Sequence, residues 1–151
     1  MKNFNILRTF LALFTLFFMS ACNSSDAVTN SEQRCPKCNM STHESNINTA
    51  KLHNKAKTYV FDDIGCLVLW AKDTDTDLNG SDVEVFSNDT QKYIPASNAF
   101  FTTDEQTPMN YGFSAYEKKR SSSIKIDEVS IKMLRGEHMA NPKIRKQMLA
   151  N

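Results

Sequence analysis

The chain has 151 residues and a formal charge of +1, and 40% of its residues are hydrophobic, enough for one domain with a modest core. The 18 basic residues are balanced by 17 acidic ones and form no basic stripe, which argues against a nucleic-acid-binding protein. With only four glycines and no phosphate-binding glycine loop, nucleotide binding is not expected either.

The N-terminus has the pattern of a bacterial lipoprotein signal peptide. Lys2 and Arg8 precede an apolar stretch, residues 10–19, that is too short to span a membrane. Two small residues and then Cys22 follow, as in the lipobox, where the cysteine thiol receives a diacylglycerol. We therefore predict a signal peptide over residues 1–21 and lipidation of Cys22. The alternative is an ordinary secreted protein cleaved after Ala21.

Residues 22–33 are predicted to be a flexible tether, because residues 23–33 have one Ala and one Val among polar residues and cannot bury a core. The folded domain then covers residues 34–151. We expect the mature protein to lie in the cell envelope, lipid-anchored and facing the periplasm. Three thiols remain after Cys22 is lipidated, and an odd number in an oxidising compartment calls for a chemical role.

The domain alternates short strands and helices, which predicts a small single α+β domain with antiparallel pairing. Asp62 or Asp63 can cap the first helix, whose apolar residues point to a buried position, and Asp127 can cap the last long one. The expected order is a hairpin (residues 49–53 and 58–61), a buried helix (64–70), short strands (83–86, 92–95, 99–102 and 112–116), a helix ending at Gly136 and a loose cationic helix from Asn141.

Sulfur side chains gather in the turn that opens the domain. Cys35, Cys38 and Met40 lie within six residues, and Cys-x-x-Cys spacing lets two thiolates meet at one ion. Met109 lies in a second turn, where a flexible thioether could be presented. Thiolate and thioether are soft donors, which select Cu(I). These four residues are candidate Cu(I) ligands, although spacing alone supports metal binding and a Cys35–Cys38 disulfide about equally.

Two further residues could join this site. His43 follows Met40 by three residues and could add a nitrogen ligand, although an exposed loop histidine fits equally well. Cys66 lies near the start of the predicted buried helix. It could be a ligand, but the pattern slightly favours a small buried hydrophobe, because cysteine is among the most buried residue types.

Three other interpretations of the cysteines stay open. A structural zinc site would need Cys66 and a histidine at no recognised spacing. A redox-active dithiol has the right spacing in Cys35 and Cys38, but the motif precedes the domain and opens no clear helix. A simple Cys35–Cys38 disulfide is the third.

Four blocks together resemble the NosL family of copper-binding lipoproteins. They are the lipobox ending at Cys22, CPKCNM at residues 35–40, FDDIGC at 61–66 and TPMNYG at 107–112. Two family glycines are replaced, by Asn39 and Asn110, but asparagine tolerates the left-handed backbone that glycine serves, so both turns can survive.

The resemblance implies a fold of ββαβ type and a Cu(I) site built from Cys35, Cys38, Met40 and Met109. It also implies a copper chaperone, not an enzyme, that serves nitrous oxide reductase in denitrification. The implied partners are the nitrous oxide reductase apoprotein and its membrane maturation machinery. A periplasmic thiol-disulfide oxidoreductase and a zinc-stabilised scaffold domain are the competing functions.

Overall fold

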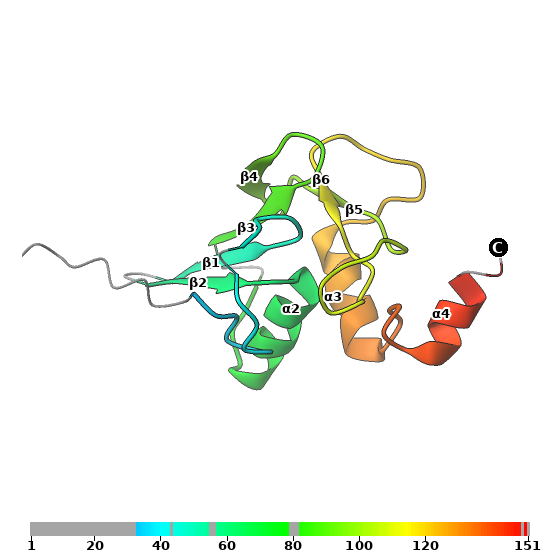
Figure 1. Cartoon of the computed structure of the whole chain (residues 1–151), viewed down its shortest axis with the longest axis horizontal. Coiled ribbons are helices and arrows are strands. Elements are labelled where there is room, and N and C mark those ends of the chain that lie inside the picture. Colours follow the sequence, from blue (N-terminus) through cyan, green and yellow to red (C-terminus); the bar gives the residue numbers. More distant parts are fainter. Residues whose placement is uncertain (1–32, 43, 55–56, 79–81, 149, 151) are drawn as a thin grey trace, which may run out of the picture. The chain divides into compact units, whose positions relative to one another are not determined.

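The computed structural model describes residues 33–42, 44–54, 57–78, 82–148 and 150 (Figure 1). The predicted signal peptide, Cys22, all of the tether except Gln33, and His43 lie outside the described residues, so the predictions for them are not tested by the fold. Residues 32–151 form one compact unit. In the described part of the chain, no helix is long and apolar enough to cross a membrane.

The fold is the predicted small α+β domain. The elements are β1 (Ala50–Asn54), β2 (Lys57–Phe61), α2 (Ile64–Asp73), β3 (Asp82–Ser87), β4 (Lys92–Pro95), β5 (Phe100–Phe101), β6 (Ala115–Tyr116), α3 (Ile126–Arg135) and α4 (Pro142–Met148). Four strands pair antiparallel in the order β2-β1-β3-β4, and β5 and β6 form a separate antiparallel pair. The first four elements have the expected ββαβ order.

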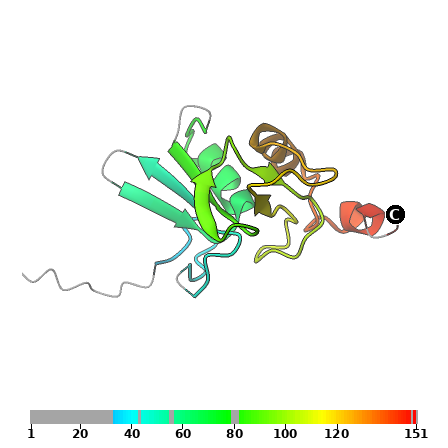
Figure 2. The same cartoon turned by 90° about the horizontal axis from the view of Figure 1, so that it is seen from above.

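Helix α2 lies against the four-stranded sheet (Figures 1 and 2), and the core between them continues to β5, β6 and α3. Period-two alternation directs Ala50 and Leu52 of β1 into the core and leaves Lys51 partly exposed. The register places Val85 beside Ala50 in the next strand, so the buried face continues across the sheet. Helix α2 contacts β1, β2 and α3, which explains why its sequence is apolar nearly all round.

The N-cap of helix α3 lies two residues before the predicted cap, Asp127. The N-cap residue is Lys125, without a side-chain cap, and Asp127 lies inside the first turn, so the predicted capping role of Asp127 is wrong. The Lys125 ammonium donates to three carbonyl oxygens at residues 97–99, which ties the start of the helix to that turn. The predicted stop is confirmed, because Gly136 ends the helix in the left-handed conformation.

Candidate metal centre

A tight turn presents the first two cysteines. The backbone N–H of Cys35 donates to the carbonyl of Met40, and the N–H of Asn39 donates back to the carbonyl of Cys35, both at 2.9 Å. Asn39 has a φ of 65°, so it takes the left-handed conformation expected of it in place of glycine. Cys38 lies within this closed turn.

The link from β2 to α2 presents the other cysteine. Asp63 is the N-cap of α2, and its Oδ1 accepts from the backbone N–H of Gly65 at 2.8 Å. Cys66 lies in the first helical turn and is fully buried. Because Asp63 does the capping, the carboxylate of Asp62 is left for another role.

These two segments bring Cys35, Cys38, Asp62 and Cys66 together, and we call these four residues the Cys3Asp cluster. One ligand atom from each lies within 4.8 Å of all the others. The three thiols are free, so the Cys35–Cys38 disulfide is not formed. The group brings Cys35 and Cys38 together, and it includes Cys66, which the sequence analysis named as a possible ligand and which is also buried.

Asp62 has one oxygen without a protein partner. Its Oδ1 accepts from the Cys38 thiol at 3.1 Å, whereas Oδ2 is buried and makes no hydrogen bond. The residue is only 4% exposed. A buried unpartnered carboxylate oxygen is costly unless a proton donor or a cation completes it. Because one oxygen of this carboxylate lies beside the three thiols, Asp62 is a natural fourth ligand for a metal ion.

The three thiols differ in pKa, because each has different hydrogen-bond partners and a different degree of burial. A hydrogen bond from Cys66 lowers the pKa of Cys35 to about 7, and this outweighs the effect of its burial. The same hydrogen bond, together with burial, raises the pKa of Cys66. Burial raises the pKa of Cys38 to about 12, and its hydrogen bond to Asp62 adds to the shift. A bound cation would favour the thiolate at all three positions, so metal binding must release protons.

The two predicted methionine ligands lie near the cluster in different surroundings. Met40 follows the turn with its side chain 44% exposed. Met109 is partly buried, and its backbone N–H donates to Oδ2 of Asp63 at 3.4 Å, which places it beside the start of α2. The cluster is defined by thiol and carboxylate atoms and does not test thioethers, so the sulfurs of Met40 and Met109 stay predicted ligands. The nitrogen of His43 also stays a predicted ligand, because His43 lies outside the described residues.

The cluster is largely enclosed. Cys35 is 2% exposed and Cys66 is fully buried, and only Cys38 is partly open. The reason is that α2 packs into the core and carries Cys66 with it. A metal ion would therefore enter and leave at Cys38, next to the exposed Met40.

A tyrosine packs against the helix turn that carries Cys66. A Cβ atom added at Gly65 would lie 2.3 Å from the Tyr111 ring, closer than any real contact. Burial raises the pKa of Tyr111 to about 12, and the charges of Cys66, Asp63 and Cys38 add to this shift. The Tyr111 ring thus forms a wall beside the cluster.

Substituting Gly65→Ala should therefore displace this wall. Overpacking typically costs about 1–3 kcal/mol of folding free energy, which outweighs the gain of alanine in a helix. Gly136→Ala is the matched control, because a Cβ there meets nothing closer than 3.8 Å. Its only expected cost is the strain of a non-glycine residue at positive φ, about 1 kcal/mol of folding free energy. Urea denaturation should show the larger loss for Gly65→Ala, and near-ultraviolet circular dichroism should change only in that variant. Equal losses with unchanged spectra would argue against the close contact.

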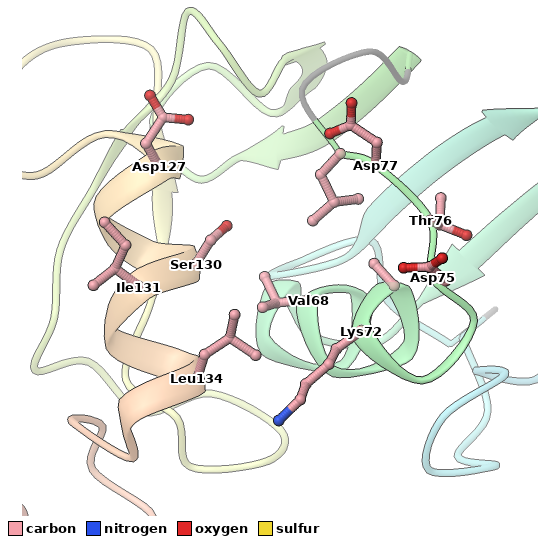
Figure 3. Close-up of a pocket in the computed structure, with 11 residues that line it drawn as sticks. Val68, Lys72, Asp75, Thr76, Asp77, Asp127, Ser130, Ile131 and Leu134 are labelled. Carbon is pink, nitrogen blue, oxygen red and sulfur yellow. The ribbon is translucent and has the colours of Figure 1, made fainter.

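A cavity of about 610 Å³ lies away from the cluster. It is found between α2 and α3, where Val68 and Leu134 approach each other (Figure 3). Asp127 lies on one rim and Asp75 and Asp77 on the other. The remaining lining residues are Ala71, Lys72, Thr76, Leu78, Ser130 and Ile131. None of the cluster residues lines it, so the metal-binding chemistry and this cavity are separate features.

Comparison with known proteins adds no relative. No family model, no curated protein and no solved structure matches the chain. The geometry of the Cys3Asp cluster therefore carries the functional argument.

Asp62 is the cluster residue that the sequence analysis missed. It was considered only as a helix cap, yet a helix start needs one capping side chain and residues 62–63 supply two adjacent acids. One of these two acids is not needed as a cap, and Cys66 follows as the third residue of the helix. This combination was the signal that could have identified Asp62 as a ligand.

Proposed function

We propose that the protein binds Cu(I) through the thiolates of Cys35, Cys38 and Cys66 and acts as a copper chaperone, not as an enzyme. The observation that carries the proposal is the convergence of three free thiols from two separate segments on one point. Three soft sulfur donors suit Cu(I). Burial of two of them keeps the bound ion away from water and oxidants.

The partly open side of the cluster suits transfer of the ion. Cys38 is the accessible ligand and Met40 is exposed next to it. An incoming thiol or thioether of a partner can join the coordination there before Cys38 leaves. Together with the four NosL-like blocks, of which the lipobox is one, this supports a lipid-anchored donor facing the periplasm, with the nitrous oxide reductase apoprotein and its membrane maturation machinery as partners.

Zinc is the second candidate, because Asp62 supplies an oxygen. Four ligands from three cysteines and one carboxylate match the coordination number of structural Zn²⁺, which accepts sulfur and oxygen alike. In that case a bound zinc ion would link the opening turn to α2. The domain would be a zinc-stabilised scaffold that loses stability on chelation.

A thiol-disulfide oxidoreductase fits less well. A reactive cysteine must be both accessible and a thiolate. Here the accessible thiol, Cys38, has its pKa raised to about 12 by burial and by Asp62, whereas Cys35, with a pKa near 7, is buried. The two requirements fall on different residues.

A competition titration distinguishes these functions. The reduced protein is titrated anaerobically with Cu(I) against a chromogenic Cu(I) chelator, and with Zn²⁺ in parallel. We expect one Cu(I) per chain, held more tightly than Zn²⁺. Tight Zn²⁺ without Cu(I) preference would support the scaffold, and no binding of either ion with a disulfide that cycles in an insulin-reduction assay would support the oxidoreductase.

The methionines need their own test. Met40→Leu and Met109→Leu together should weaken Cu(I) binding by roughly tenfold, because a neutral thioether adds less than a thiolate does. Met133→Leu is the matched control, since Met133 is 2% exposed in the core. If the double variant binds Cu(I) as tightly as the Met133→Leu control does, the methionines are not ligands and the cluster acts alone.

A further inference from the structure

Residues 107–112 are tied to the start of α2 by a buried hydrogen bond. The hydroxyl of Thr107 donates to Oδ2 of Asp63 at 2.6 Å, and both residues are buried. Asp63 uses its other oxygen to cap α2. One carboxylate therefore orders the helix start beside the cluster and, at the same time, a segment distant in sequence.

Thr107 also orders its own segment. Its hydroxyl oxygen accepts from the backbone N–H of Tyr111 at 3.1 Å and of Gly112 at 3.4 Å, and its carbonyl accepts from Asn110 at 2.9 Å. Asn110 has a φ of 54°, which closes the turn. The Thr107 hydroxyl is thus shared between the turn and Asp63, so its loss would free both.

The same segment places an aromatic ring at the cluster. The Tyr111 ring lies directly on Gly65, the neighbour of Cys66. His138 packs edge-to-face with the same ring, with ring centroids 5.0 Å apart, and Met139 donates from its backbone N–H to the Tyr111 carbonyl at 3.1 Å. These contacts and the contact with Gly65 hold the ring at the helix turn that carries a fully buried thiol.

We propose that residues 107–112 form a latched cover on the Cys3Asp cluster, with Thr107 as the positioning residue and the Tyr111 ring as the shield of Cys66. The cover keeps solvent and competing thiols away from the Cys66 side and leaves Cys38 as the route of exchange. Its consequence for metal exchange rests on the function proposed above, whereas the cover itself is a property of the metal-free protein.

Thiol labelling of the metal-free, reduced protein tests the cover. N-ethylmaleimide is added for increasing times, and peptide mass spectrometry gives a separate rate for Cys35, Cys38 and Cys66. In the unsubstituted protein Cys66 should react most slowly of the three, because it is fully buried. Thr107→Val should speed labelling of Cys66 by tenfold or more, with a smaller change at Cys38. In Thr107→Ser, which keeps the hydroxyl, the labelling rate of Cys66 should stay within twofold of that in the unsubstituted protein.

Two further variants guard against general loss of structure. Tyr111→Leu removes the ring but not the latch and should also speed labelling of Cys66. Thr90→Val is the matched control, because Thr90 is a partly buried threonine whose hydroxyl donates to Ser87, outside the cluster. A rate for Cys66 in Thr107→Val no faster than in Thr90→Val would overturn the cover, and so would equal acceleration of all three thiols in both variants.

Cu(I) release gives an independent second result. Loaded protein is mixed with excess chelator, and Thr107→Val should release the ion at least tenfold faster than Thr107→Ser. If the unsubstituted protein holds no Cu(I), the proposed function fails, and the labelling rates still decide whether the cover exists.

Discussion

Cys66→Ser is expected to weaken Cu(I) binding by about 100-fold or more, a loss of at least ~2.7 kcal/mol of binding free energy. Serine keeps the size of the side chain but replaces a soft sulfur by a hard oxygen, which Cu(I) disfavours. Loss of partners that only orient ligands already costs about 10–100-fold in metal affinity, so loss of a direct ligand should reach the upper end or beyond. Competition with a chromogenic chelator measures the change.

Cys22→Ser makes the same chemical change outside the cluster and is the matched control. It should leave Cu(I) affinity unchanged within twofold in unlipidated protein. Cys35→Ser and Cys38→Ser should lower the Cu(I) affinity as Cys66→Ser does, since the three thiols converge on one point. If only Cys35 and Cys38 matter, Cys66 is a buried packing residue and the cluster has two thiolate ligands.

Asp63→Ala should destabilise the metal-free domain by about 3 kcal/mol, the sum of a lost helix cap and of buried donors left without an acceptor. The donors are the hydroxyl of Thr107 and the backbone N–H of Gly65. Burial raises the pKa of Asp63 to about 6, so the comparison is best made at pH 7.5, where its carboxylate is ionised. Urea denaturation measures the difference.

Asp62→Ala, one residue earlier, should behave in the opposite way. Its buried Oδ2 has no partner, so removal of this carboxylate should cost the metal-free protein less than about 1 kcal/mol or stabilise it. Zn²⁺ affinity should fall by about 10–100-fold, whereas Cu(I) affinity should change by less than about tenfold, because the oxygen matters more to zinc. Equal destabilisation by the two substitutions would contradict the separate roles assigned to the adjacent acids.

Local patterns predicted most of the fold. Strand alternation in β1 and the apolar run of α2 gave the right element types, because burial on one face or all round is written into short stretches of sequence. The left-handed turns at Asn39 and Asn110 were also predictable, since few residues accept that conformation. The start of α3 was not, because the Lys125 ammonium finds its carbonyl partners only in the folded chain.

The cluster shows where such patterns stop. Cys-x-x-Cys spacing is local, so the pairing of Cys35 with Cys38 could be predicted. The arrival of Cys66 and Asp62 at the same point depends on how the opening turn packs against the start of α2, which spacing alone does not encode. That Asp63 and not Asp62 caps α2 could not be predicted from the sequence either. Both are good capping residues, and only their packing in the folded chain decides which of them does so.

The coordination of copper in the loaded protein is the most direct measurement of the central claim. X-ray absorption spectroscopy of the anaerobic Cu(I) complex should show a first shell of about three sulfur atoms. That shell should lose one sulfur in Cys66→Ser and remain unchanged in Cys22→Ser. A first shell dominated by nitrogen and oxygen, or a spectrum that Cys66→Ser leaves unchanged, would contradict copper binding by the three thiolates.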